Sequence, residues 1–157
     1  GQERHRHCRR VSVSEAIATD NYQNYGVLYN YPAASISCPD GWHSAEHSEW
    51  LALFQHVNNN SGPLKSTRTA PDDPHPRWNS PNTGATNSTG FTGFPGGARS
   101  NNNTFTALGL YGIWYSSEIS ATEARRVSFD NDNTTIFPNY YQTKSQGNAV
   151  RCVRNEN

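Results

Sequence analysis

The chain has 157 residues, with 13 Lys and Arg balanced by 13 Asp and Glu, so its formal net charge is zero. The length fits one domain, and 33% hydrophobic with 11% aromatic residues is enough to build a core. Zero net charge argues against a nucleic-acid partner, which requires a basic face. The sequence also lacks an apolar run of about 18 residues, which argues against membrane insertion.

The first ten residues differ from the rest of the chain. Residues 1–10 read as a basic leader or tail, and residues 11–157 as a single domain. This leader is either a solvated terminus or an electrostatic binding arm. The sequence contains no Met, so we expect a processed protein or a segment of a larger polypeptide. The basic residues of the leader are Arg4, Arg6, Arg9 and Arg10.

The N-terminal half of the domain predicts short elements and one longer helix. Alternation predicts a strand at 11–13, and composition predicts another at 25–31. Residues 14–18 between them suit a helical turn or a return into a loop, and a short helix is expected to begin at Ala33–Ala34 after Pro32. Residues 45–57 predict an amphipathic helix. Its apolar face is expected to hold Trp50, Leu51, Phe54 and Val57, with Ser44 as N-cap.

The C-terminal half predicts an antiparallel sheet preceded by a long loop. Residues 65–90 are rich in Pro, Asn, Thr and Ser, and Trp78 is the side chain most able to anchor them. Short strands follow, separated by Gly and Asn. We expect these strands near residues 104–106, 112–116, 124–129, 134–137 and 148–154. One clear helix, long loops and an antiparallel sheet predict an α+β domain.

The three cysteines leave one unpaired in any single disulfide. If the protein is oxidised, we expect Cys38 to bridge Cys152, closing a long loop and stabilising the fold by roughly 4 to 5 kcal/mol. Cys8 would then be free or paired with another chain. The alternative is that Cys38 and Cys152 are small buried hydrophobic residues.

Several sequence blocks resemble a known family. The string Tyr25-Gly-Val-Leu-Tyr-Asn is followed by Cys38-Pro-Asp-Gly-Trp-His43 and Glu49-Trp50. Further blocks are Asn82–Phe91, Phe94-Pro-Gly-Gly-Ala-Arg99, Tyr111–Ser117 and Gly147–Arg154. In this order they resemble the Fibrobacter succinogenes major paralogous domain. The resemblance implies a C-type-lectin-like fold, related to formylglycine-generating enzymes and to retroelement-diversified variable proteins of phages and bacteria.

The resemblance also implies which residues form the scaffold and which are displayed for ligand binding. Relatives that are diversified keep their scaffold with glycines, tryptophan and serines and vary positions on one face of the C-terminal sheet. By this analogy the scaffold is Gly109, Gly112, Trp114, Ser116, Ser117, Arg151 and Cys152. The displayed, ligand-binding set is Leu110, Ile113, Tyr115, Arg125, Ser128, Asp130, Asn131, Asn133, Phe137, Asn139, Tyr140 and Tyr141. We expect Trp114, Phe129 and Val150 to point inward.

The residues favour binding over chemistry. By sequence, neither Cys38 nor Cys152 sits in an active groove that would activate a thiolate, so we expect no enzyme, and one of the formylglycine-generating kind is the less favoured alternative. His43 and His47 have the spacing of two metal ligands on a helix, but we expect no metal site because no third ligand joins them. Residues 130–133 carry oxygen ligands suited to calcium, although a solvated turn is the favoured interpretation. We therefore expect no cofactor, with calcium as the alternative.

These observations predict a non-catalytic recognition module, adhesin-like or receptor-binding, on a cell, pilus or virion surface. Its tyrosines lie among Asn, Ser and Thr, a mixture suited to binding a protein or glycan. The alternative is a structural subunit that self-associates through the same face or is linked to a larger polypeptide.

Overall fold

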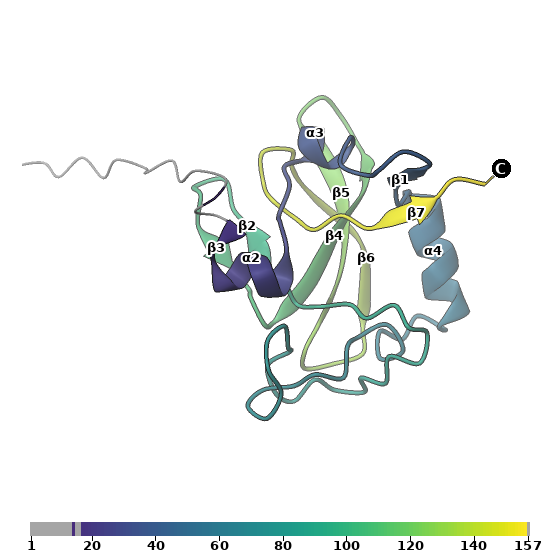
Figure 1. Cartoon of the computed structure of the whole chain (residues 1–157). Coiled ribbons are helices and arrows are strands. Elements are labelled where there is room, and N and C mark those ends of the chain that lie inside the picture. Colours follow the sequence, from purple (N-terminus) through teal and green to yellow (C-terminus); the bar gives the residue numbers. More distant parts are fainter. Residues whose placement is uncertain (1–13, 15–16, 157) are drawn as a thin grey trace, which may run out of the picture.

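An antiparallel sheet of three strands forms the centre of the fold (Figure 1). The computed structural model describes residue 14 and residues 17–156. The central strands are β4 (Tyr111–Glu118), β5 (Glu123–Asp130) and β6 (Ile136–Thr143), in the order β4-β5-β6. Two smaller antiparallel pairs join β1 (Trp42–Ser44) to β7 (Cys152–Arg154) and β2 (Ala98–Arg99) to β3 (Phe105–Thr106). The helices are α2 (Asp20–Tyr25), α3 (Tyr31–Ala34) and α4 (His47–His56).

This arrangement confirms a mixed α/β fold with antiparallel sheets and few helices. Helix α4 lies on one side of the central sheet, and α2 with the β2–β3 pair lies on the other (Figure 1). The predicted leader 1–10 and strand 11–13 lie outside the described residues, as do residues 15 and 16 of the predicted helical turn. None of the helices in the described part of the chain is long and apolar enough to cross a bilayer.

Helix α4 confirms the predicted helix with a different cap. It begins after Glu46, whose side chain accepts a hydrogen bond from the backbone of Glu49, while the Glu49 carboxylate accepts one from the Glu46 N–H at 2.7 Å. This reciprocal capping box satisfies two donors at the helix end. The prediction of Ser44 as N-cap is therefore wrong, because Ser44 belongs to β1. Leu51 is 44% exposed, so it does not share the buried face.

The predicted strand 25–31 is wrong. Helix α2 ends at Tyr25, and Gly26 caps it with a φ of 77°. Beyond it Tyr29 forms one isolated antiparallel bridge, exchanging both backbone hydrogen bonds with Asn148. Strand-type composition leads to a strand only where a neighbouring strand can pair along its length, and in this segment the pairing is the single bridge of Tyr29 with Asn148.

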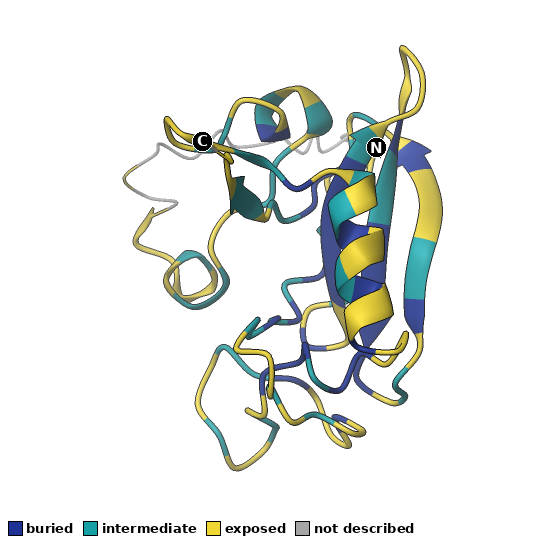
Figure 2. Ribbon diagram, turned by 90° about the vertical axis from the view of Figure 1, so that its right-hand side faces the viewer, coloured by how far each residue is buried: buried dark blue, intermediate teal, exposed yellow. Residues whose placement is uncertain are grey.

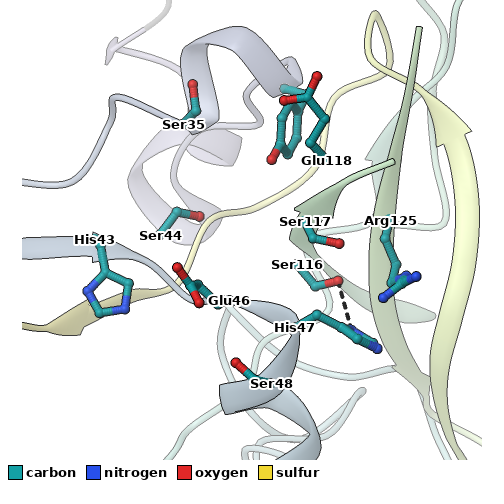
Figure 3. Close-up of a pocket in the computed structure, with 11 residues that line it drawn as sticks. Ser35, His43, Ser44, Glu46, His47, Ser48, Ser116, Ser117, Glu118 and Arg125 are labelled. Atoms are coloured by element: carbon teal, nitrogen blue, oxygen red, sulfur yellow. Dashed lines mark hydrogen bonds between the residues drawn. The ribbon is translucent and has the colours of Figure 1, made fainter. Parts of the chain in front are cut away.

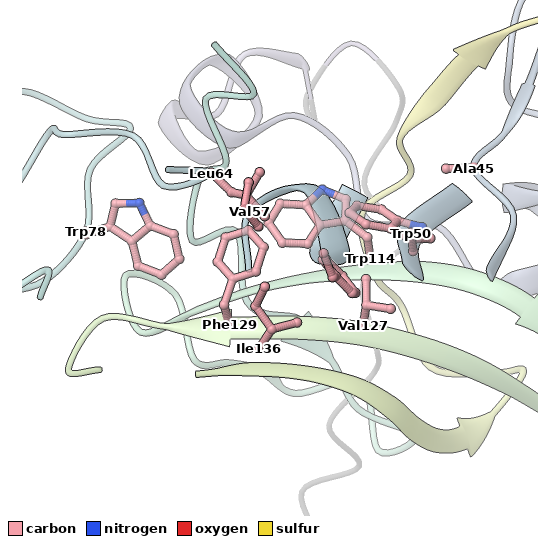
Figure 4. Close-up of a cluster of buried hydrophobic side chains, with 10 residues drawn as sticks. Ala45, Trp50, Val57, Leu64, Trp78, Trp114, Val127, Phe129 and Ile136 are labelled. Atoms are coloured by element: carbon pink, nitrogen blue, oxygen red, sulfur yellow. The ribbon is translucent and has the colours of Figure 1, made fainter. Parts of the chain in front are cut away.

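The core is a column of aromatic rings between α4 and the sheet (Figure 4). Trp50 of α4 lies 5.8 Å from Trp114 of β4, and Trp114 lies 4.9 Å from Phe129 of β5, measured between ring centroids. The rings are almost fully buried, while the opposite face of α4 is exposed (Figure 2). Gly112 makes room for this packing, since a Cβ there would lie 2.4 Å from the Trp114 ring. The inward orientations predicted for Trp114 and Phe129 are confirmed.

The long irregular segment is anchored to the same column. Trp78 has no exposed surface, stacks on Phe129 at 6.1 Å and donates its indole N–H to the Gly93 carbonyl at 3.0 Å. Phe91 packs edge-on against Trp50 and Trp114. The prediction that Trp78 anchors this loop is confirmed.

The disulfide prediction is also confirmed. Cys38 is bonded to Cys152, with the two Cα atoms 5.7 Å apart. The bond attaches β7 to the turn that precedes β1, and it spans a sequence separation of 114 residues. By the loop-entropy argument it stabilises the fold by about 4 to 5 kcal/mol.

Lys65 is a buried residue that connects the turn after β5 to the long loop. Its ammonium group is completely buried and donates to the backbone carbonyls of Thr83 at 2.7 Å, Asp130 at 3.0 Å and Asn133 at 2.9 Å. Burial lowers the pKa of Lys65, opposed by the charges of Asp130 and Asp132. Three acceptors from two distant segments therefore share one buried cation.

Replacing this cation tests its structural role. We expect Lys65→Met to lower the free energy of unfolding by about 2–4 kcal/mol, because buried carbonyls lose their donor. Denaturant unfolding followed by tryptophan fluorescence measures the change. Arg68→Met is the matched control, since Arg68 is exposed on the same segment. Equal stability of Lys65→Met and the parent would contradict the role.

Candidate functional site

The structure divides the predicted ligand-binding set by burial. Five of these residues are buried, so the prediction that they are displayed is wrong: Ile113, Tyr115, Ser128, Asp130 and Asn131. The reason is that the central strands are covered on both faces. Tyr115, for example, packs under Tyr31 with ring centroids 5.2 Å apart and donates its hydroxyl to the Gln146 carbonyl at 2.6 Å.

The other seven residues of the set reach solvent. Leu110, Asn139, Tyr140 and Tyr141 are exposed, and Arg125, Asn133 and Phe137 are half-buried. They do not form one surface. The alternation of β6 sends Tyr140 toward Arg126 and Tyr141 toward Arg125, on opposite faces of the sheet.

One face carries an aromatic groove, which we define by Tyr111, Arg126, Phe137, Tyr140 and Gln142. Its volume is about 370 Å³. It lies between the central sheet and the β2–β3 side of the molecule, since Ala98 and Thr106 also line it. Ile113 and Ser128 line its inner part, which gives these two buried residues a place in the groove wall.

The side chains of the aromatic groove hold one another in place. The Arg126 guanidinium lies 4.9 Å from the centroid of the Tyr140 ring and donates to the Ser128 hydroxyl at 3.2 Å. Phe137 packs edge-on against Tyr140 at 5.8 Å. Burial lowers the pKa of Arg126, and the nearby tyrosines oppose this effect. The groove therefore presents ordered rings beside a partly desolvated cation.

The opposite face carries a polar pocket, which lies among α3, the start of α4 and strands β4 and β5 (Figure 3). Its volume is about 510 Å³. His47 and Ser116 face each other, with Nδ1 and Oγ 3.2 Å apart, and Arg125 lies beside them. Ser116 and Ser117 follow Trp114, and a bulge in β4 between Tyr115 and Ser117 turns both hydroxyl-bearing residues toward this pocket.

The two histidines of the polar pocket have opposite electrostatic environments. Hydrogen bonds with Asn155 and Glu49 raise the pKa of His43. Burial lowers the pKa of His47, and the positive charge of Arg125 lowers it further, against a hydrogen bond with Asn139. At neutral pH the His47 ring is therefore uncharged.

The turn at residues 130–133 is solvated only in part, since Asp132 is exposed and Asn133 is half-buried. Asp130 and Asn131 are 4% and 8% exposed. The Asp130 carboxylate accepts from the Asn133 amide at 2.9 Å, and the ammonium group of Lys65 lies among the backbone carbonyls of the same turn. Burial raises the pKa of Asp130. In the described part of the chain, no cluster of three or more His, Cys, Asp or Glu could hold a metal ion.

The sequence blocks agree with a comparison against protein families. The sequence model of the Fibrobacter succinogenes major domain matches residues 5–154. The chain belongs to this family. No curated protein and no solved structure matches the chain.

The residues that line the aromatic groove and the polar pocket all lie inside the region that matches the Fibrobacter succinogenes major domain. Part of the predicted leader, residues 5–10, also lies inside the matched region. Sequence reasoning missed Arg126, which lies next to the predicted Arg125 and on the other face of the strand. It also missed His47 as a neighbour of β4, because only the fold brings α4 onto that strand.

The histidine environments give a direct titration test. We expect His43 to titrate above about pH 6.5 and His47 below it in NMR spectra of the ring protons. Folding lowers the pKa of His47. The contribution of His47 to the free energy of unfolding therefore decreases as the pH falls below the pKa that this residue has in the unfolded chain. Arg125→Gln should raise the His47 midpoint and leave His43 unchanged, whereas Asn155→Ala should lower only the His43 midpoint. Identical midpoints for the two rings in the parent protein would contradict the assigned environments.

Proposed function

We propose that this domain is a non-catalytic recognition module of an extracellular surface. It binds a protein or glycan through the aromatic groove. The observation that carries the proposal is the ordered set Arg126, Phe137 and Tyr140, whose rings and guanidinium line one concave surface.

The chemistry of the groove supports recognition. Tyr140 is 47% exposed although it contacts both Arg126 and Phe137, so its contact surface is available and its rotamer is restrained. Restrained aromatic side chains lose little entropy on binding, and Tyr and Arg are enriched among the residues that dominate interface energies. Gln142 adds a buried side-chain amide to the lining of the groove.

The disulfide bond supports the proposed extracellular location and the proposed non-catalytic function. Disulfides such as Cys38–Cys152 form and persist mainly in oxidising compartments, including the extracellular space. The same bond removes both of these sulfurs from thiolate chemistry of the formylglycine-generating kind. Cys8 lies outside the described residues.

The decisive variant is Tyr140→Ala. Screening the isolated domain against glycan and cell-surface protein arrays identifies a ligand, and titration then measures its affinity. We expect Tyr140→Ala to weaken binding roughly fivefold to thirtyfold, because truncating a central aromatic contact costs about 1–2 kcal/mol. Phe137→Ala should act in the same direction.

Tyr141→Ala is the matched control. Tyr141 is the adjacent, 58% exposed tyrosine on the opposite face, so its removal should leave groove binding unchanged. Equal affinity of Tyr140→Ala and the parent would contradict binding through the groove. Light scattering tests the alternative that the domain is a structural subunit. A stable oligomer that Tyr140→Ala dissociates would identify the groove as a contact between copies of this chain.

A further inference from the structure

The polar pocket contains a cation without an anionic partner. Arg125 forms no ion pair within the described part of the chain. Its Nε atom is buried without a hydrogen-bond partner, and its guanidinium lies 5.7 Å from the Tyr141 ring. The neighbouring Ser117 hydroxyl is also buried and unpartnered. Buried donors without acceptors cost free energy, so a ligand that supplies an acceptor here is favoured.

The carboxylates that line the same pocket have their own partners. Glu118 pairs with Lys144, and Glu46 is held in the capping box of α4. Neither is an ion-pair partner of Arg125. Their negative charges do affect the choice of ligand, because they disfavour a dianion more than a monoanion. A single carboxylate therefore suits the site better than a phosphate monoester.

The rest of the pocket is lined with hydroxyl groups. Ser116 contacts the neutral His47 ring, and the first turn of α4 adds Ser48. Ser35, Ser44 and Tyr31 add further hydroxyl groups, and His43 also lines the pocket. A volume of about 510 Å³ exceeds what one carboxylate fills, and the surrounding hydroxyls match a ligand that carries several hydroxyls of its own.

We propose that the polar pocket binds an acidic sugar, with its carboxylate placed between Arg125 and Ser117 and its hydroxyls facing the serine-lined wall. A guanidinium recognises a carboxylate through two parallel N–H donors, which fixes the orientation of the sugar. The site is separate from the aromatic groove, since the two lie on opposite faces of the central sheet.

Sodium glucuronate is the probe, with D-glucose and sodium acetate at equal concentration and ionic strength as comparisons. NMR spectra of the arginine Nε–Hε groups report the environment of Arg125 directly. We expect glucuronate to shift the Arg125 signal in a saturable way, with half-saturation on the order of 1 mM. Acetate should bind at least about tenfold more weakly, because it lacks the hydroxyls, and glucose should cause no shift. Absence of a saturable shift with glucuronate, or equal binding of acetate, would overturn the proposal.

Four variants separate this site from the groove. Ser117→Ala removes one unpartnered hydroxyl and should weaken glucuronate binding about threefold to tenfold, and Arg125→Gln should abolish it. Arg154→Gln changes an exposed arginine of β7 and should bind like the parent. Tyr140→Ala should also retain glucuronate binding. Unchanged affinity in the Ser117→Ala and Arg125→Gln proteins would overturn the proposal independently of any result for the groove.

Discussion

The structure depends on the aromatic column that runs from α4 through the central sheet to the long loop. Trp50, Trp114, Phe129 and Trp78 form successive contacts along it, and Phe91 fills the space beside three of these rings. Aromatic side chains bury large areas and pack in specific geometries, so one column can fix elements that share little hydrogen bonding. This matters because residues 57–97 contain no helix or strand of their own.

The column occupies one face of the sheet, and this explains why the candidate sites lie where they do. Beyond the end of the column, the same face opens into the polar pocket, where a bulge in β4 and the start of α4 bring Ser116, His47 and Arg125 together. On the other face, the aromatic groove lies between the central sheet and the β2–β3 side of the molecule, where Tyr140 reaches solvent. One rigid sheet therefore presents two chemically different surfaces, one rich in rings and one rich in hydroxyls.

Local patterns in the sequence predicted the elements, and the tertiary contacts decided the exceptions. The helix at 45–57 follows from periodicity, and the strands that became β4 and β5 follow from the turn residues between them. The Cys38–Cys152 bond follows from the position of both cysteines inside the predicted domain. Burial of Tyr115 could not be predicted, because it depends on Tyr31 from a distant segment. From the sequence alone a lysine such as Lys65 is expected in solvent. The fold instead brings the carbonyls of Thr83 and Asn133 to its ammonium group. The C-type-lectin-like class stays a prediction from the family resemblance.

Hydrogen exchange of backbone amides tests most directly whether the aromatic column holds the loop and the sheet as one unit. The Trp78 N–H donates to Arg68 and the Ser66 N–H donates to Gly93, both inside the long irregular segment. If the column carries this segment, these amides exchange with the same opening free energy as those of Trp114 and Phe129, because all open only with the core. Exchange of the loop amides at a much lower opening free energy, with the sheet still protected, would contradict the account.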